Sequence, residues 1–191
     1  PTQLNVIQYV TIAQTGNAVD FGDTSRVGHQ SCTCSSPTRG LFGGVFGSPG
    51  DSNIIDYITI ATTGNCADFG DMITSGYGGR GGCSNSIRGL FAGGWDSSAS
   101  AITNAMDYVT ISTLGNSIDF GDLTTGFTSF SGCPSSPTRG VWAGGYAPGK
   151  TNIIEYVEIM TTGNSKDFGD LANVAAYGSA GSCSNGHGGL G

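Results

Sequence analysis

IDYITIATTGNCADFGD, the sequence from Ile55 to Asp71, occurs in four similar copies along this chain of 191 residues. The tyrosines of the copies are separated by 48, 51 and 48 residues: Tyr9, Tyr57, Tyr108 and Tyr156. A constant period of about 50 residues is typical of proteins built from repeated structural units, which are too small to bury a core alone. The sequence therefore predicts a single domain, residues 1–191, with repeats at approximately 1–51, 52–101, 102–150 and 151–191.

The segment around each tyrosine has the pattern of a β-strand. Ile58 and Ile60 follow Tyr57 by one and three positions and share one face, whereas Ile55 and Tyr57 share the other. A strand that is apolar on both faces is covered on both sides. We therefore expect sheets that stack face upon face, and no appreciable helix.

Two motifs follow each tyrosine strand. Gly-Asn, as in Gly64-Asn65, tolerates positive φ and predicts a hairpin turn. Asp-Phe-Gly-Asp then predicts a short returning strand whose Phe packs inward and whose carboxylates cap turns. Its acidic residues, which we expect to be structural, are Asp20, Asp23, Asp68, Asp71, Asp119, Asp122, Asp167 and Asp170.

A recurring arginine begins the last strand of three repeats. Arg39, Arg88 and Arg139 each stand before a short apolar run that stops at a double glycine. Because an arginine fork suits multidentate bonding, we expect these side chains to form ion pairs with the Asp-Phe-Gly-Asp carboxylates, or hydrogen bonds to loop carbonyls.

Composition excludes some classes of function. The net charge is −7, with only seven Lys and Arg residues, so the chain lacks the positive surface that binds phosphate backbones and we expect no nucleic acid partner. No run of 18 apolar residues occurs, so we expect no membrane insertion.

The cysteines are expected to be free. Cys34, Cys83, Cys133 and Cys183 occupy one position in successive repeats, where the repeat period separates them. His29 and His187 are the only histidines, which is too few for a multi-histidine metal cage. We therefore expect no bound metal and no cofactor.

The runs before the double glycines resemble the kelch repeat. They are Leu41–Gly44, Leu90–Gly94 and Val141–Gly145, each followed by a tyrosine strand. Kelch repeats form the blades of β-propellers, so the resemblance implies an all-β chain of four blade-like units. A kelch blade carries a Trp after its Tyr, whereas this chain has a Phe, as at Phe69.

The arrangement of the blades has two possible forms. In the first, the two ends of the chain complete one shared blade and close a four-bladed ring. In the alternative, the chain is part of a larger propeller or of a β-solenoid array. The unfinished strand at Gly191 favours the alternative.

The combined string of tyrosine strand, Gly-Asn turn, Asp-Phe-Gly-Asp and double-glycine strand resembles repeats of virion structural and fibre-like proteins of marine and cyanobacterial tailed phages. That resemblance implies a location on a virion surface or outside a cell. It also implies other virion or filament proteins as partners, with a host-surface glycan and further copies of the chain as additional candidates.

The motifs of common enzymes are missing. Asp-Phe-Gly occurs in kinases, but there it occurs once, with a His-Arg-Asp loop that this chain lacks. The regular oxygen ligands of a calcium loop, the clustered His and Tyr ligands of a copper oxidase and a Gly-x-Ser-x-Gly elbow are also absent. We therefore expect a protein that is not an enzyme.

Two functions remain. In the first, an adhesion module binds a host glycan or receptor through variable loops whose aromatic residues stack on the ligand. These candidate ligand-binding residues are Tyr77, Trp95, Phe127, Phe130 and Tyr146. In the second, the chain is a purely structural subunit of a filament or particle coat, and the same aromatic residues are buried between subunits.

Overall fold

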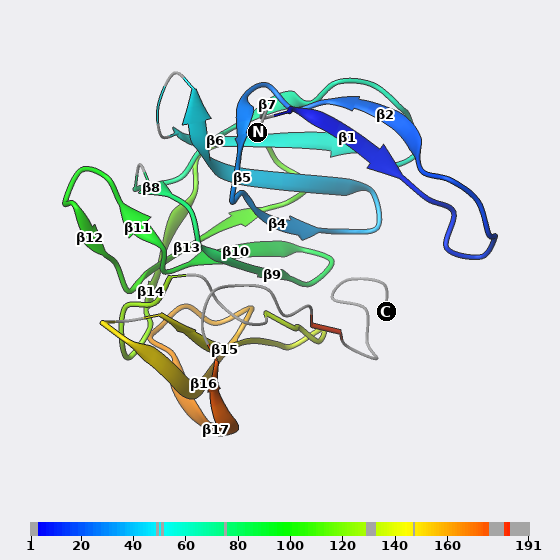
Figure 1. Cartoon of the computed structure of the whole chain (residues 1–191). Coiled ribbons are helices and arrows are strands. Elements are labelled where there is room, and N and C mark those ends of the chain that lie inside the picture. The colour runs from blue at the N-terminus through cyan, green and yellow to red at the C-terminus, as the bar shows by residue number, and fades with distance from the viewer. Residues whose placement is uncertain are drawn as a thin grey trace.

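The computed structural model describes residues 4–48, 50, 52–74, 76–128, 133–146, 148–175 and 182–183. Within these residues the chain consists of strands and turns with no helix, which confirms the predicted all-β class (Figure 1). Accordingly, no helix in this part of the chain is long and apolar enough to cross a membrane. The strands are β1 Val6–Tyr9, β2 Val19–Asp23, β3 Val27–His29, β4 Cys32–Ser35, β5 Arg39–Ser48, β6 Ser52–Thr59, β7 Ala67–Asp71, β8 Gly76–Tyr77, β9 Gly81–Ser84, β10 Arg88–Ala92, β11 Trp95–Asp96, β12 Ala101–Ile102, β13 Ala105–Thr110, β14 Ile118–Asp122, β15 Arg139–Tyr146, β16 Lys150–Glu158 and β17 Lys166–Ala175.

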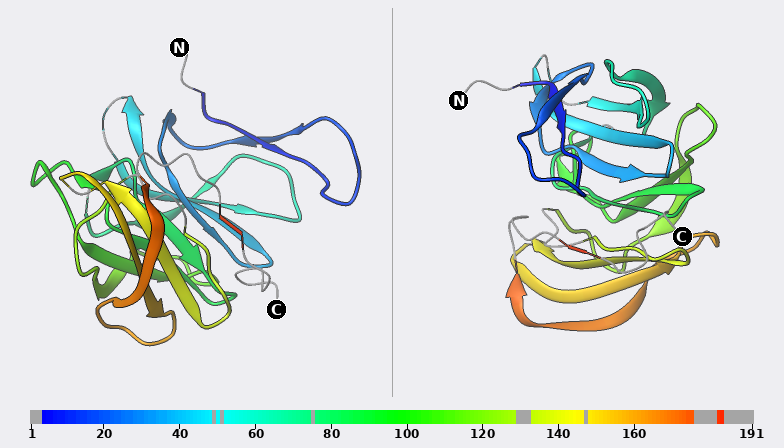
Figure 2. Two further views of the ribbon diagram at one scale, coloured as in Figure 1. Left: turned by 60° about the horizontal axis from the view of Figure 1, so that its bottom comes forward. Right: turned by 90° about the vertical axis from the view of Figure 1, so that its right-hand side faces the viewer.

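The strands form small antiparallel sheets in chain order. One sheet contains β3, β4, β5, β6 and β7, the next has the order β9-β10-β13-β14, and a third has the order β15-β16-β17. Strands β1 and β2 form a two-stranded sheet, and β8, β11 and β12 form a small side sheet. Figures 1 and 2 show these sheets following one another from the blue to the orange end of the chain.

Each main sheet joins two sequence repeats. The first of them begins with β3 at Val27, within the first repeat, and ends with β7 at Asp71, within the second. Consecutive repeats are therefore interlocked by strand pairing.

Every Asp-Phe-Gly-Asp strand contains a bulge. In β7, Gly70 pairs with Ile55 and Asp68 pairs with Asp56, so Phe69 is left over as the bulged residue. Gly70 has φ +145°, a conformation that side chains rarely adopt. The glycine of the motif therefore makes the bulge possible.

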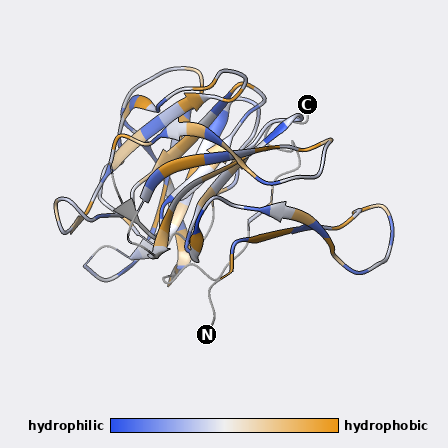
Figure 3. Ribbon diagram, turned by 90° about the horizontal axis from the view of Figure 1, so that it is seen from above, coloured by the Kyte–Doolittle hydropathy of each residue, from blue (hydrophilic) through white to orange (hydrophobic). Residues whose placement is uncertain are grey.

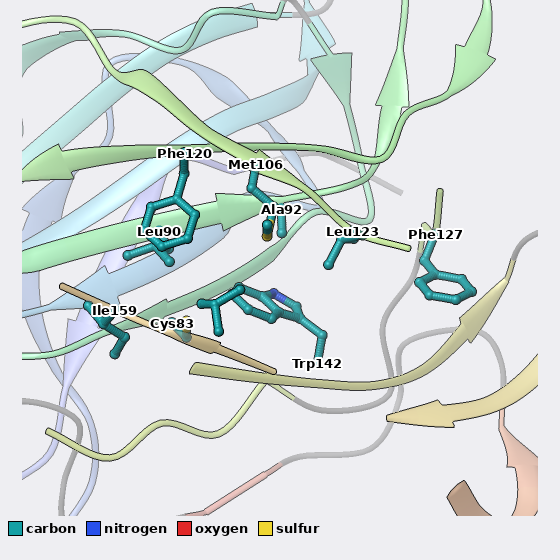
Figure 4. Close-up of a cluster of buried hydrophobic side chains, with 10 residues drawn as sticks. Cys83, Leu90, Ala92, Met106, Phe120, Leu123, Phe127, Trp142 and Ile159 are labelled. Carbon is teal, nitrogen blue, oxygen red and sulfur yellow. The ribbon is translucent and has the colours of Figure 1, made fainter. Parts of the chain in front are cut away.

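The core lies between the sheets. Strand β10 illustrates this, because Leu90 and Ala92 belong to one apolar cluster and Phe91 to the other, and each side chain is 0% exposed. The cluster around Leu90 also contains Trp142 from β15, whose ring nitrogen donates to the Gly81 carbonyl at 3.2 Å (Figure 4). The predicted covering of both faces of the tyrosine strands is confirmed at β13, where Met106 and Val109 are 0% and 3% exposed and belong to different clusters.

The predicted four-bladed closure is not formed by the described residues. Strand β1 pairs only with β2, and none of the described strands from the end of the chain joins them. All six cysteines are free, as expected.

Candidate functional site

The Gly-Asn turn of each repeat is seated on the Asp-Phe-Gly-Asp strand of the repeat before it. The Gly64 amide donates to the Phe21 carbonyl at 2.7 Å, and the Cys66 amide donates to the Asp23 carbonyl at 2.8 Å. In return the Asp23 amide donates to Asn65 Oδ1 at 3.0 Å. We call this arrangement the joint.

The joint is repeated along the chain. Between the second and third repeats, Asn116 accepts from the Asp71 amide at 3.0 Å, and between the third and fourth, Asn164 accepts from the Asp122 amide at 3.1 Å. The amides of Gly115 and Gly163 donate to the carbonyls of the preceding Phe residues at 2.9 and 2.7 Å. The Asn residues thus connect repeats, in addition to forming the predicted turn.

In two of the repeats, the first aspartate of the motif accepts a hydrogen bond of the kind predicted to cap a turn. Asp68 accepts from the Gly70 amide at 3.2 Å, and Asp167 accepts from the Gly169 amide at 3.1 Å. Each carboxylate therefore caps the bulge of its own strand.

The prediction that the arginines pair with these carboxylates is wrong. Arg39 and Arg88 instead donate to the carbonyls of Ile111 and Ile159, which directly follow β13 and β16 of the next main sheet, at 2.8 and 3.2 Å. The alternative expectation, hydrogen bonds to loop carbonyls, is confirmed for these two. Arg139 donates to Glu158 at 2.8 Å on the surface.

Each recurring arginine also lies over the tyrosine of its own sheet. The guanidinium carbon is 4.8, 4.3 and 4.7 Å from the ring centroid in the pairs Arg39–Tyr57, Arg88–Tyr108 and Arg139–Tyr156. The arginine thus combines a cation–π contact with a polar bond.

A buried acid precedes the tyrosine in the last three repeats. These residues are Asp56, Asp107 and Glu155, which are 6%, 2% and 1% exposed. Each accepts a hydrogen bond from a backbone amide just after the preceding Asp-Phe-Gly-Asp strand. Burial raises the pKa of Glu155 despite hydrogen bonds from Ser165 and Thr124.

Among the described residues, Asp107 is the one acid of the three with an arginine partner. Asp107 Oδ1 accepts from Arg80 at 3.0 Å, and its Oδ2 accepts from Ser117 at 2.7 Å. Arg80 also donates to Thr74 Oγ1. Arg80 stands three residues before Cys83, and the corresponding residue before Cys34 is Ser31.

A pocket of about 210 Å³ lies where this arginine is missing, between the first two repeats. Its walls include Ser31, Asp56, Arg26 and the ring of Phe42. Asp56 Oδ2 accepts from the Ser25 amide and hydroxyl at 2.9 and 2.7 Å. Asp56 Oδ1 and Arg26 Nε are buried and have no hydrogen-bond partner within the described structure.

Unpartnered buried polar atoms are rare in folded proteins, and each calls for an explanation. Here an acceptor, Asp56 Oδ1, and a donor, Arg26 Nε, belong to side chains that line the same pocket. The residues that line the pocket therefore include an unpartnered acceptor, an unpartnered donor and an aromatic side chain.

A larger cleft of about 660 Å³ lies along the edges of β4 and β9. Ser84 Oγ there donates to the Ser35 carbonyl at 2.8 Å and accepts from the Ser35 amide at 3.1 Å. None of the side chains that line this cleft is among those with an unpartnered buried polar atom in the described structure. The smaller pocket is therefore the stronger candidate.

The predicted aromatic candidates lie partly together. The backbone of Tyr77 pairs with that of Trp95, and the Gly94 amide donates to the Phe127 carbonyl at 2.6 Å. Tyr146 forms an isolated bridge with Thr128, next to Phe127. Phe130 lies outside the described residues.

Phe127 is not a surface ligand-binding residue. Its side chain is 2% exposed and belongs to the core cluster that contains Trp142 (Figure 4). Trp95 and Tyr146 are half-buried. The aromatic positions therefore do not form a fully open platform.

No protein-family model matches the chain, and no curated protein matches it. Solved structures do match, and one of them is the structure of YjhT, a kelch-like β-propeller. The TM-score is 0.67 at 10% sequence identity, over 82% of this chain and 56% of YjhT. The described sheets are thus similar in arrangement to part of a β-propeller, and the chain spans little more than half the length of YjhT.

Proposed function

We propose that this protein is a non-enzymatic adhesion module of a virion surface or fibre, and that it binds one sugar ring of a host glycan beside Asp56. Its fold is part of a kelch-like β-propeller. The likeness to YjhT supports the propeller over a β-solenoid, and the joints support blades that follow one another around an axis.

The observation that carries the ligand proposal is the pair of unpartnered polar atoms at the pocket, Asp56 Oδ1 and Arg26 Nε. A carboxylate accepts hydrogen bonds from hydroxyl groups, and a guanidinium donates hydrogen bonds to hydroxyl oxygens. A sugar ring presents both kinds of group, and its C–H face suits an aromatic ring such as Phe42.

The size of the pocket limits the ligand. Its volume of about 210 Å³ is smaller than the roughly 300–1,000 Å³ of pockets for drug-sized molecules. The bound unit is therefore a single ring at the end or branch of a glycan, and the rest of the glycan lies outside.

Ser31 offers a sharp test. Ser31→Arg places at the pocket the side chain that Arg80 supplies to Asp107 at the next joint. We expect saturable binding on a glycan array by the 191-residue chain, loss of that binding in Ser31→Arg, and weakened binding in Asp56→Asn. Ser31→Ala is the matched control, because it leaves the pocket open and should keep the binding.

Two results would contradict this site. If the unmodified chain binds no sugar on a glycan array, the proposal that its ligand is a glycan is contradicted. Binding that survives Ser31→Arg but disappears in Trp95→Ala would move the site to the aromatic residues near β11.

A purely structural subunit of a filament or particle coat is the second candidate. It is favoured by apolar side chains that are exposed on the outer repeats, such as Ile12 at 98% and Phe168 at 55%. The position of the chain in an intact particle tests this candidate, because a structural subunit would have those residues covered by neighbours and would bind no glycan.

A further inference from the structure

The first repeat presents the free half of a joint. At the second and third internal joints, the apolar residue three positions after the tyrosine packs against the preceding sheet: Ile111 and Ile159 are 1% and 0% exposed, whereas Ile60 at the first joint is 45% exposed. The equivalent Ile12 is 98% exposed, on the β1–β2 hairpin that projects from the other sheets (Figure 3). The Gly64, Gly115 and Gly163 amides each donate to a phenylalanine carbonyl of the repeat before, whereas no described residue accepts from the Gly16 amide.

The fourth repeat presents the other half. The phenylalanines of the first three Asp-Phe-Gly-Asp strands are 7%, 2% and 2% exposed: Phe21, Phe69 and Phe120. Phe168 in β17 is 55% exposed. A β-carbon on Gly70 would lie 2.5 Å from the Gly115 carbonyl oxygen, whereas one on Gly169 would meet nothing within 4 Å.

We infer that these two faces are complementary, and that the turn Thr15–Asn17 of one copy of the chain docks on the strand Asp167–Asp170 of a second copy. The internal joints supply the pattern of bonds. The Gly16 amide would donate to the Phe168 carbonyl, and the Asp170 amide would donate to Asn17 Oδ1. Val10 and Ile12 of the first copy would cover the apolar face behind Phe168.

This contact joins two different surfaces of the chain. Each added copy therefore leaves one turn and one strand free, until the rotation closes a ring or the chain of copies continues as a filament. The copies repel one another because each carries a net charge of −7. Added salt screens this repulsion and should strengthen the association.

The association is measured by sedimentation velocity and native mass spectrometry of the 191-residue chain over a range of concentrations. We expect masses that are multiples of 19.3 kDa. Ile12→Asp and Phe168→Asp should each raise the dissociation constant by about 100-fold, and Asn17→Ala by about tenfold. Leu114→Asp is the matched control, because Leu114 is 53% exposed on the turn of a joint that is already formed; it should associate normally.

A mixing experiment tests the head-to-tail geometry. Ile12→Asp keeps its strand face and Phe168→Asp keeps its turn, so each variant alone should be monomeric, whereas their mixture should form a dimer and stop there. Circular dichroism checks that both variants fold. A chain that remains monomeric at about 1 mM, a concentration at which even weak interfaces associate, or variants that fail to complement each other, would overturn the inference.

Discussion

Gly70 lies against the turn of the next repeat so closely that an added β-carbon would stand 2.5 Å from the Gly115 carbonyl oxygen. Gly22 and Gly121 have the same relation to Gly64 and Gly163. The glycine of Asp-Phe-Gly-Asp thus meets two requirements at once. It permits the bulge conformation within its own strand, and it leaves space for the neighbouring turn.

A comparison of Gly70→Ala with Gly169→Ala separates the cost of the backbone conformation from the cost of the contact with the turn. Gly70→Ala and Gly169→Ala both place a side chain at positive φ, +145° and +139°, so both should lose stability through backbone strain. Only Gly70→Ala also collides with a turn, and we expect it to lose about 1–3 kcal/mol more. Urea unfolding measures the difference, and equal losses would mean that the turn does not press on Gly70.

Asn116 is expected to stabilise the second joint. Its Oδ1 accepts from the Asp71 amide at 3.0 Å, so Asn116→Ala should lower the free energy of unfolding by about 1 kcal/mol. Asn17→Ala is the control in dilute solution, because no described residue donates a hydrogen bond to Asn17 Oδ1, unlike Asn65, Asn116 and Asn164. A loss in both variants would assign the effect to the turn itself.

Arg88 should contribute more to the free energy of unfolding than Arg139. Arg88 is half-buried, donates to the Ile159 carbonyl at 3.2 Å and stacks on Tyr108, so Arg88→Ala should cost about 2 kcal/mol. Arg139 forms an exposed ion pair with Glu158, and its removal should cost less than about 1 kcal/mol. Thermal unfolding of both variants makes the comparison. An unchanged melting temperature in Arg88→Ala would show that its contacts do not hold the repeats together.

Stability is expected to fall in alkali because of the buried thiols. Burial raises the pKa of Cys32 from 9.0 to about 12 in the folded protein. The unfolded chain releases this proton near pH 9, while the folded protein retains it. The stabilisation is therefore complete below pH 9 and is lost as the pH rises toward 12, by about 1.4 kcal/mol per pH unit.

Cys32→Ala tests this dependence. Between pH 9 and 11 its stability should fall less steeply than that of the unmodified chain, because all other titrating groups are shared. Cys183→Ser changes an exposed thiol and serves as the control. Identical slopes in Cys32→Ala and the unmodified chain would contradict the raised pKa.

The sequence predicted the features that depend on local pattern. The tyrosine period, the strand around Tyr57 and the turn at Gly64 follow from alternation and from residues that tolerate positive φ. The individual carbonyls that bind Arg39 and Arg88 could not be predicted, because they are backbone groups beside the next sheet and carry no residue signature.

Two further features of the sequence carry information about the joints and the pocket. An acid precedes the tyrosine in the last three repeats, whereas the first repeat has Gln8 at this position. The pocket depends on Ser31 standing where the next repeat has Arg80. Its presence required the structure, because only the structure shows that Arg80 reaches Asp107.

The joint between repeats is tested most directly by amide hydrogen exchange of four equivalent glycines, at a concentration low enough to keep the chain monomeric. Gly64, Gly115 and Gly163 donate their amides across a joint, whereas no described residue accepts from the Gly16 amide. We expect the first three amides to exchange at least about 100-fold more slowly than that of Gly16, since exchange requires the joint to open. Exchange of all four at the same rate would contradict the joint.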